Sequence, residues 1–507
     1  MKNFNHPYDY YEHKIINNFK DYLELAKNDY NKKIAYSFYK DEERITKTFN
    51  DVYSETLKLT SYFIKNYKNK HIALIGENSY NWIITFLAIV LSGNICVVLD
   101  KDLNKEELSN LMKASDTDII YYSKKYCSFI DELKFKSYPI DSIEDYFKEE
   151  IDINKIKVNN TKDAVIFFTS GTTGPNKPVL LSQKSIARNI YGASSLFVPY
   201  GSVVAFLPFH HAFGLITGIL KAFYYGVEVY INHSLKYLVD DFKREKPEIV
   251  FAVPAFIEMF YKIINRKLKE HNIDIDHLNF FVKRKVRKEF GGKLEYIICG
   301  GAPLDEKYIK WFRTIGIEIL NGYGITECSP VVSVNRNNYH KDGSVGVPCR
   351  DVEVKIIDEE ICIKGDILMN GYYKNEKETK EIIKNGYLHT GDIGYIDDDG
   401  FIFITGRKKN IIILSNGENI SPELIEKELK KDNAVEEVIV CESDNKLTAV
   451  IYPNSDYLNN EEYFDNLIYE YNKDKAKNHQ VTNIILRDKE FIKNNNGKII
   501  RAKALED

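Results

Sequence analysis

Several features that would specify other classes of protein are missing from this chain of 507 residues. Its seven cysteines are scattered and form no CxxC pair, which argues against a disulfide framework and against a zinc site. Its formal net charge is only -4, so the composition gives no electrostatic case for a nucleic-acid partner. Residues 1–20 lack the continuous apolar core of a secretory signal. We therefore expect a cytoplasmic protein that does not bind nucleic acid.

A long uninterrupted hydrophobic run is also missing. The one strongly apolar stretch, residues 82–99, is broken around Gly93, well short of the roughly 20 residues that span a bilayer. We expect no transmembrane segment there, but a buried helix capped by Asn78 or Ser79, followed by a strand. A second apolar strand, residues 71–75, precedes this helix. The three elements predict a β-α-β unit, which is typical of a doubly wound sheet.

The length predicts roughly three structural units at about 150 residues per domain. Short apolar strands recur between helical stretches, at residues 164–168, 203–207, 248–253 and 295–299. This pattern favours a parallel α/β architecture. Between Val345 and Phe403 the pattern changes to short strands with turn signals, which predicts a small β-rich subdomain. After Arg407 the sequence predicts a compact α+β unit of about one hundred residues.

The most informative segment runs from Thr169 to Pro178, directly after a predicted strand. Its glycines and hydroxyl side chains let N–H and O–H groups surround an anion, while Lys177 supplies a positive charge. By its chemistry this is a phosphate-binding loop. It differs from the Walker loop, which requires glycine at Asn176 and serine or threonine at Pro178. A flexible surface turn is the alternative for this segment taken alone.

Two further segments are predicted to follow strands. These are residues 300–303 and 321–327, and open α/β sheets bind ligands at the carboxyl ends of their strands. Tyr323 offers a flat face to a purine, Thr326 a hydroxyl to a phosphate, and Glu327 a hard oxygen ligand to Mg²⁺. Taken alone, this segment is also compatible with an aromatic core turn and a solvated glutamate.

A carboxylate and a guanidinium farther along the chain are predicted to reach the same ribose. Asp392, which ends the segment 386–392, can accept hydrogen bonds from both hydroxyls of a ribose. Arg407 follows beyond a predicted hairpin and is placed to reach the same sugar. By itself, Asp392 is equally compatible with a turn residue.

In order and spacing, these segments resemble the core motifs of the adenylate-forming superfamily, which contains acyl-CoA synthetases, adenylation domains and luciferases. The matching segments are TSGTTGPNK, NGYGITE, YLHTGD, GRKKNIIILSNGENISPELIE and NGKIIR. Together they make coincidence remote, whereas each alone is a weak signal. The resemblance implies an α/β fold with an N-terminal domain, residues 1–408, of doubly wound mixed sheets and a β-barrel-like subdomain at about 340–405. It also implies a small mobile α+β C-terminal domain, residues 409–507.

The resemblance implies roles for individual residues. It assigns the β- and γ-phosphates of ATP to Thr169, Ser170, Gly171, Thr172, Thr173, Gly174 and Lys177. It assigns the adenine to Gly301, Ala302, Asn321 and Tyr323, the α-phosphate to Thr326, Mg²⁺ to Glu327, and the ribose to Asp392 and Arg407. Lys498 matches the family's mobile catalytic lysine, Lys409 its hinge, and Gly417 the glycine beside its thiol tunnel. Pro178 stands where the family usually has glycine; it fixes φ and removes an N–H donor, so we expect loop mobility and pyrophosphate release to differ.

The activated acid is predicted to be apolar. His211 matches the aromatic or histidine gate of acyl- and aryl-CoA synthetases, with His210 as the second candidate. The assigned acyl pocket comprises His211, Phe213, Gly214, Gly300, Gly324 and Ile325. Amino-acid-activating members place an aspartate near this motif, but no acidic residue occurs between Val203 and Tyr225. Because a buried ammonium without a partner is costly, an α-amino acid is disfavoured. The stretch Val203–Leu220 is predominantly apolar, which favours an apolar tail, and the resemblance implies a fatty acid as the substrate.

The expected reaction is ATP-dependent activation of a carboxylic acid through an acyl-adenylate, followed by acyl transfer to the thiol of coenzyme A. Attack on the α-phosphorus brings two anions together, and we expect Mg²⁺, Lys177 and Lys498 to stabilise the charge that develops. One alternative is a ligase that loads the phosphopantetheine of an acyl carrier protein. Another is a catalytically silent nucleotide-binding relative, suggested by Pro178. Retention of Glu327, Asp392, Arg407 and Lys498 argues against the silent relative.

Overall fold

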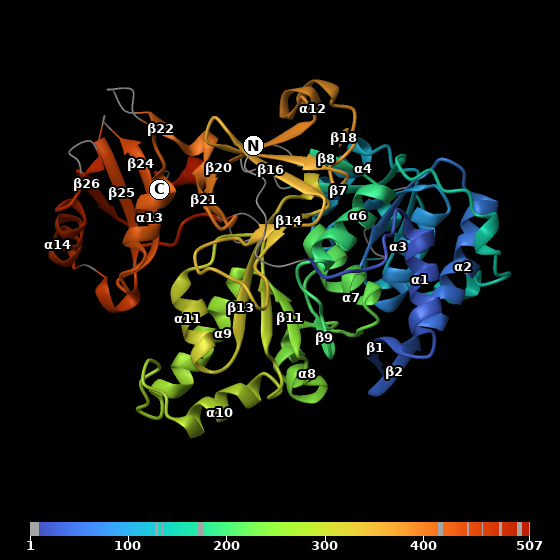
Figure 1. The fold of residues 1–507 in the computed structure, drawn as a ribbon, viewed down its shortest axis with the longest axis horizontal. Coiled ribbons are helices and arrows are strands. Elements are labelled where there is room, and N and C mark those ends of the chain that lie inside the picture. The colour runs from blue at the N-terminus through green and yellow to red at the C-terminus, as the bar shows by residue number, and fades with distance from the viewer. Residues whose placement is uncertain are drawn as a thin grey trace.

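Three sheets with flanking helices, followed by a smaller α+β unit, make up the chain (Figure 1). The computed structural model describes residues 10–126, 130–133, 135–169, 177–413, 419–443, 446–458, 460–475, 479–493 and 499–505. The predicted α/β class is therefore confirmed, and the sheets are mixed, as expected.

The first sheet has the described strand order β15-β14-β13-β12-β11-β9-β10-β1-β2. Its strands are β1 (Ile34–Lys40), β2 (Glu43–Thr48), β9 (Ser202–Ala205), β10 (Glu228–Ile231), β11 (Ile249–Ala252), β12 (Tyr296–Cys299), β13 (Glu318–Gly324), β14 (Val331–Val334) and β15 (Val347–Pro348). The central strands pair in parallel, whereas β2, β14 and β15 pair antiparallel to their neighbours. The parallel core thus carries antiparallel strands at both edges.

The second sheet has the described order β18-β8-β7-β4-β3-β5-β6. Its strands are β3 (His71–Ile75), β4 (Ile95–Val98), β5 (Ile119–Tyr122), β6 (Lys136–Pro139), β7 (Asp163–Thr169), β8 (Lys177–Ser182) and β18 (Gly371–Tyr372). The predicted β-α-β unit is confirmed, because β3 and β4 pair in parallel on either side of α3 (Tyr80–Leu91). Ser79 caps this helix by accepting from the N–H of Trp82, and nearly every helix residue is buried, as an all-round apolar sequence requires.

Helices cover both sheets and fill the space between them. Those that precede residue 340 are α1 (Phe19–Tyr30), α2 (Phe49–Asn66), α4 (Lys105–Ala114), α6 (Gln183–Ser194), α7 (Lys221–Tyr224), α8 (Leu238–Glu245), α9 (Pro254–Lys269), α10 (Phe280–Glu289) and α11 (Glu306–Thr314). Helix α6 contacts β7 and β8 of the second sheet and β14 of the first, so one hydrophobic core spans both sheets. None of the described helices combines the length and apolarity needed to cross a bilayer.

The predicted β-rich region forms a third, antiparallel sheet. It contains β16 (Val352–Ile357), β17 (Glu360–Gly365), β19 (Ile383–Lys384), β20 (Tyr387–Ile396) and β21 (Ile402–Arg407), with α12 (Glu376–Ile382) beside them. Asp397 closes the β20–β21 hairpin because its carboxylate accepts from the N–H of Phe401. The turn signal in the sequence therefore has a structural cause.

The α+β unit after Arg407 has its own hydrophobic core. Its elements are β22 (Ile412–Ile413), β23 (Asn419–Ile420), α13 (Pro422–Leu429), β24 (Val435–Ser443), β25 (Lys446–Pro453), α14 (Glu461–Asn472) and β26 (Asn483–Leu486). Ser421 precedes α13, but its hydroxyl makes no capping bond and donates instead to the carbonyl of Thr405 at 2.7 Å. Ser421 thus occupies the N-cap position of α13 without making the usual capping hydrogen bond. The domain limits of 1–408 and 409–507 stay predictions.

Lys221 of α7 is a cation buried in the hydrophobic core that the first two sheets share. Its ammonium donates to the carbonyl of Ala193, and the described residues include no carboxylate paired with it. Burial lowers the pKa of Lys221 from its usual 10.5 to about 8. Between these pH values the unfolded chain binds more protons than the native one, so the free energy of unfolding rises with pH.

We expect Lys221→Met to raise the free energy of unfolding at pH 7 by about 1–2 kcal/mol, because the cost of burying an ammonium disappears. The variant should also lose the part of the pH dependence between 8 and 10.5 that the parent shows. Urea unfolding at several pH values measures both effects. Lys221→Arg is the matched control and should be less stable than the parent throughout, because a guanidinium keeps its charge. A Lys221→Met protein less stable than the parent at pH 7 would contradict the interpretation.

Candidate active site

A buried carboxylate joins two strands at the centre of the predicted site. Asp392 of β20 is 3% exposed, and its Oδ1 lies 2.6 Å from Nε of Arg407 on β21. The two residues are direct cross-strand partners in the hairpin. The other oxygen, Oδ2, accepts a 2.5 Å hydrogen bond from the hydroxyl of Tyr323 on β13. The predicted proximity of Asp392 and Arg407 is thus present, and Tyr323 joins them from a different sheet.

Burial raises the pKa of Tyr323, and the neighbouring Asp392 carboxylate raises it further, so the phenol stays a proton donor. Only 9% of Tyr323 is exposed. The tyrosine therefore acts here as a donor that fixes the carboxylate, in addition to offering a ring face.

The segment around Tyr323 differs from its predicted position. We expected residues 321–327 to follow a strand, but β13 continues through Gly324. The strand pairs in parallel with β12 up to Asn321 and then antiparallel with β14 from Gly322 onward. Gly324 lies so close to the Pro330 carbonyl oxygen that a Cβ atom would come within 2.0 Å of it. The glycines that suggested a loop therefore allow close backbone approach inside a sheet.

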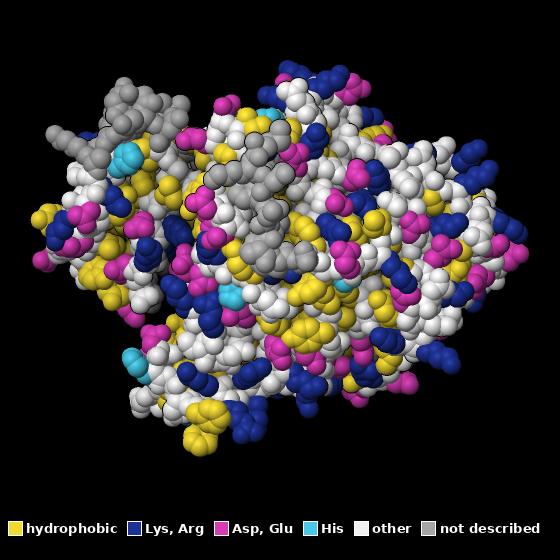
Figure 2. All heavy atoms as spheres, viewed as in Figure 1, with side chains coloured by type: hydrophobic (Ala, Val, Ile, Leu, Met, Phe, Trp, Pro, Cys, Tyr) yellow, Lys and Arg dark blue, Asp and Glu magenta, His cyan; other side chains and the backbone are white. Residues whose placement is uncertain are grey.

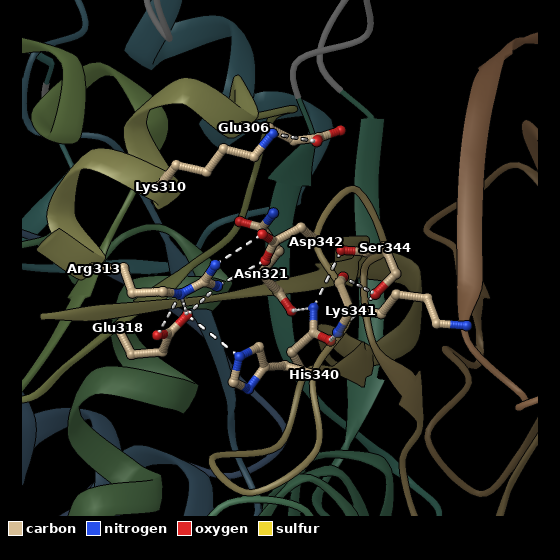
Figure 3. Close-up of polar contacts among 10 residues, drawn as sticks. Glu306, Lys310, Arg313, Glu318, Asn321, His340, Lys341, Asp342 and Ser344 are labelled. Atoms are coloured by element: carbon tan, nitrogen blue, oxygen red, sulfur yellow. Dashed lines mark hydrogen bonds and ion pairs between the residues drawn. The ribbon is translucent and has the colours of Figure 1, made fainter. Parts of the chain in front are cut away.

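An ion-pair cluster fixes the loop that leaves this sheet edge (Figure 3). Arg313 of α11 binds Glu318 at 2.6 Å and Asp342 at 2.8 Å, and this pairing lowers the pKa of Asp342. The carbonyl of Asn321 accepts from the N–H of Asn335 at 2.9 Å. Segment 335–342 is thereby held against β13 on the stretch that carries the predicted adenine residue Asn321.

The ends of the predicted phosphate loop are adjacent. Thr169 ends β7 and Lys177 begins β8, and the two residues pair directly across the strands. Ser170, Gly171, Thr172, Thr173 and Gly174 lie outside the described residues. The Lys177 ammonium forms an ion pair with Glu378 and lies 5.3 Å from the centre of the Tyr372 ring. Pro178 sits within β8, where its carbonyl accepts from the N–H of Tyr373.

The predicted metal ligand is joined to this lysine through one aromatic residue. Glu327 lies in a single 3₁₀ turn, η7 (Thr326–Cys328), and its Oε1 accepts from the Tyr372 hydroxyl at 2.8 Å. Burial and the Glu327 carboxylate raise the pKa of Tyr372. Among the described residues, no partner is bonded to the second oxygen of Glu327. A carboxylate in this position fits the hard oxygen ligation that Mg²⁺ prefers.

Residues 323–327 therefore connect two networks. Tyr323 donates to Asp392, which also pairs with Arg407, at one end, and Glu327 accepts from Tyr372, beside Lys177, at the other. The structure brings together the predicted ribose, metal and phosphate residues along one continuous segment. Thr326 lies between the two networks, at the start of η7.

The glycines after β12 lie beside the predicted acyl residues. A Cβ atom on Gly300 would come within 3.2 Å of the Phe213 ring, so Gly300 and Phe213 are adjacent. Gly301 has a φ of +87°, a conformation that glycine adopts without strain. Gly214 lies close to the Pro208 carbonyl, and Ile325 donates its N–H to the Pro330 carbonyl at 3.0 Å. Ala302 is exposed in the turn that follows Gly301.

The two candidates for the gate, His210 and His211, are adjacent and partly buried. The rings of His210 and His211 lie 4.4 Å apart, and burial lowers the pKa of both imidazoles, so they are neutral near pH 7. Nε2 of His210 lies 3.2 Å from Asp100, which follows β4. The sequence argument considered only residues 203–225 and missed this carboxylate, because it comes from a distant strand. This carboxylate already binds His210.

The third sheet contains a cluster of possible metal ligands next to Asp392. Donor atoms of Glu360, Cys362 and His389 lie within 4.8 Å of one another. The cluster is already bonded internally, because Glu360 accepts from His389 at 3.1 Å, from Lys408 at 3.0 Å and from the Gly391 N–H at 2.7 Å. With an ammonium on the carboxylate, we interpret the cluster as a network that fixes the strand on which Asp392 lies.

The C-terminal candidates lie at or beyond the end of this sheet. Lys409 is exposed in a 3₁₀ turn directly after β21. Gly417 and Lys498 lie outside the described residues. Contacts between the C-terminal unit and the rest of the chain include the packing of α13 against β21, the Ser421–Thr405 hydrogen bond and the ion pairs Lys262–Glu436 and Lys427–Glu306.

Sequence reasoning missed Tyr372, Glu378, Asp100 and Glu360, which support the predicted residues from other elements. No local pattern marks them, since each acts through a contact more than 25 residues away along the chain. A cavity of about 370 Å³ elsewhere, lined in part by Tyr67, Asn94 and Gln183, contains none of the predicted site residues.

Known protein families, curated proteins and solved structures resemble this chain. The family described as AMP-binding enzyme matches residues 23–373, and the family described as AMP-binding enzyme C-terminal domain matches residues 409–507. The long-chain-fatty-acid–CoA ligase FadD15 of Mycobacterium bovis is 25% identical over 428 residues, which cover 73% of this chain and 70% of that protein. Long chain acyl-CoA synthetase 1 of Arabidopsis thaliana is 26% identical over 497 residues, covering 82% of this chain and 74% of the relative.

The matched segments span between 53% and 74% of the length of these and two similar curated relatives. Among solved structures, O-succinylbenzoate coenzyme A synthetase (MenE) from Bacillus subtilis, in complex with ATP and magnesium ion, has a TM-score of 0.78. The alignment covers 96% of this chain and 99% of that one at 21% identity. This likeness establishes the same fold over both parts of the chain.

Proposed function

Because this chain belongs to the AMP-binding enzyme family, whose members include AMP-forming acid–CoA ligases, we propose that it makes a fatty acyl-CoA through an acyl-adenylate. ATP and a carboxylic acid react to give the adenylate and pyrophosphate, and the acyl group then passes to the thiol of coenzyme A. The observation that carries this proposal is the continuity of residues 323–327 with Asp392 and Arg407 on one side and Tyr372 and Lys177 on the other.

Each network supports one part of ATP binding in this proposal. Asp392 receives the ribose hydroxyls and is held in place by Arg407 and Tyr323, so it is preorganised before the nucleotide arrives. Asn321, Gly301 and Ala302 border the adenine. The residues 169–174 and Lys177 receive the β- and γ-phosphates, which requires the Lys177 ammonium to exchange its Glu378 partner for phosphate oxygens.

Glu327 would hold Mg²⁺, which supplies positive charge to the phosphates when bound. Tyr372 orients the Glu327 carboxylate by donating to one oxygen, so the other oxygen would be available to hold the ion. Thr326 is adjacent and is proposed to donate its hydroxyl to the α-phosphate. Lys498 is proposed to stabilise the charge that develops there during adenylate formation.

A fatty acid is the proposed substrate. Phe213, Gly300 and Gly214 present apolar or small surfaces beside the neutral imidazole of His211, which suits an acyl chain and a carboxylate near its end. The one carboxylate found beside this gate, Asp100, already binds His210, so it is not arranged to pair a substrate ammonium. Similarity to the long-chain-fatty-acid–CoA ligase FadD15 supports the same choice.

The C-terminal unit is proposed to be a mobile domain that turns about Lys409. Lys498 and the thiol need the same space at different steps, and hinges absorb backbone rotation at few residues. The small number of polar contacts described between residues 421–436 and the larger part suits a unit that detaches and re-docks.

Pyrophosphate release with a panel of fatty and aromatic acids tests the proposal. We expect release that depends on ATP, Mg²⁺ and a fatty acid, with acyl-CoA formed when coenzyme A is added. Adenylate formation without transfer to coenzyme A, but with transfer to an acyl carrier protein, would replace the proposal with the carrier-protein ligase. Absence of pyrophosphate with every acid would favour a silent nucleotide-binding protein.

A further inference from the structure

Helix α10 exposes two neighbouring aromatic side chains at the molecular surface. Phe280 is 71% exposed and Phe281 is 79% exposed, the two highest values among the exposed large hydrophobic residues of the described chain. Their rings are in edge-to-face contact with centroids 5.8 Å apart. Isolated exposed apolar residues are ordinary, but two adjacent phenylalanines that both protrude form a patch that needs an explanation.

Exposed basic side chains share the face of α10 that carries these rings. Residues three and four apart lie side by side on a helix, so Arg284 and Lys288 continue the row of Phe280, and Lys285 continues that of Phe281. All three basic residues are exposed, and no carboxylate in the described part of the chain pairs with them. Figure 2 shows hydrophobic atoms next to Lys and Arg atoms at the lower edge, where Figure 1 places α10.

Acidic residues near α10 are engaged elsewhere. Glu289 at the end of the helix lies 3.0 Å from Lys243 and 3.8 Å from Lys267. Before the helix, the Asp274 carboxylate bonds His277 at 2.8 Å, and Asp276 is exposed. The face defined by the two rings and three cations therefore has a local positive charge, although the chain carries a net charge of -4.

The helix that presents this face is firmly attached to the fold. Asn279 caps its first turn by accepting from the Val282 N–H at 3.0 Å, and Val286 is buried on the side opposite the exposed rings. Phe290, which follows the helix, is buried against Phe260 and Phe312. A fixed scaffold thus holds the phenylalanines in solvent, which excludes a frayed segment as the cause of their exposure.

We propose that this face of α10 docks on the surface of an anionic phospholipid bilayer. The two rings insert at the boundary between headgroups and acyl chains, and Arg284, Lys285 and Lys288 bind lipid phosphates. A bilayer fits better than an acidic protein, because the rings project outward as a convex ridge and a protein partner would need a matching pocket. Because the chain as a whole is net acidic, attraction of this basic face to an anionic surface also favours one orientation.

Sedimentation with lipid vesicles tests this proposal without ATP, acid or coenzyme A, so its outcome is independent of the proposed reaction. The full chain should bind vesicles made of equal parts phosphatidylcholine and phosphatidylglycerol, bind pure phosphatidylcholine vesicles far less, and dissociate as salt is added. The double variant F280S/F281S should lower the vesicle partition coefficient at least about tenfold. The triple variant R284E/K285E/K288E should lower it by a similar or larger factor.

The double variant L424S/Y469S is the matched control, because Leu424 and Tyr469 are exposed apolar residues on α13 and α14, away from α10. It should bind vesicles like the parent, and all variants should keep the parent's circular dichroism and unfolding midpoint. No binding by the parent would overturn the proposal. The proposal would also be overturned if F280S/F281S bound vesicles as well as the parent. If this variant lost binding to a purified acyl carrier protein while its vesicle binding was unchanged, the face would bind a protein partner and the proposal would be wrong.

Discussion

An Asp392→Asn enzyme should require roughly a hundredfold more ATP for half-maximal adenylation than the parent, because a charged acceptor at the ribose becomes a neutral amide. In the native site the carboxylate accepts from both Arg407 and Tyr323. An amide keeps one acceptor oxygen, but its NH₂ group is itself a donor and cannot accept the second of these two hydrogen bonds. Arg407 also loses its counter-charge, so the free energy of unfolding should fall by about 3 kcal/mol and the variant should unfold at a lower urea concentration. Pyrophosphate release as a function of ATP, together with urea unfolding, measures both effects.

The matched control is Asp397→Asn, on the turn of the same hairpin. Asp397 pairs with Lys341 and accepts from the Phe401 N–H, but it contacts none of the predicted site residues. This variant should lose some stability and keep the parent's dependence on ATP concentration. If both variants weakened ATP use equally, the effect would belong to the hairpin as a whole, and the assignment of Asp392 to the ribose would be wrong.

The elements that could be predicted from sequence are those with local causes. An apolar run with Ser79 before it and Gly93 after it specifies α3, because capping and helix termination need only neighbouring residues. The Asp392–Arg407 pair was foreseen for the same reason, since a hairpin turn fixes which residues face each other across its strands.

The rest depends on contacts between distant segments. Residues 321–324 were placed in a loop, but a strand forms there because β14 supplies an antiparallel partner that no local pattern reveals. Tyr372 reaches Glu327 only because β18 pairs with β8 at the edge of the second sheet. Tyr323 reaches Asp392 across a chain separation of 69 residues and from a different sheet. Motif resemblance named the residues that are proposed to touch the ligands, whereas their supporting partners required the fold.

These partners have a shared physical role. Tyr323 and Tyr372 each hold a carboxylate of the predicted site in one orientation before any ligand binds. A site arranged this way does not need to reorganise its dipoles when charge develops at the phosphates. Such electrostatic preorganisation is a main source of catalysis in enzymes. The exception is Lys177, whose ammonium is bound to Glu378 and has to change partner. We therefore expect phosphate binding, and not ribose binding, to involve side-chain rearrangement.

The second large effect is expected for Lys498→Ala, whose role is assigned by its position in the NGKIIR motif. Removing a cation that acts only on developing charge should lower the rate of adenylation by about a hundredfold to a thousandfold. Transfer from preformed acyl-AMP to coenzyme A does not involve charge build-up at the α-phosphate of ATP, so this step should fall less than about tenfold. Single-turnover measurements of pyrophosphate release and of acyl-CoA formation from synthetic acyl-AMP separate the two steps.

Lys503→Ala is the control for this experiment, because Lys503 is an exposed lysine in the same C-terminal segment. It should leave both half-reactions close to the parent rate. A uniform loss in both half-reactions for Lys498→Ala would indicate that the residue supports the structure of the C-terminal unit and has no special part in adenylation. A selective loss in adenylation has a further consequence, since it requires the unit containing residue 498 to approach the ATP site during that step. The contacts described at Thr405, Glu306 and Lys262 would then have to be compatible with such an approach or break during it.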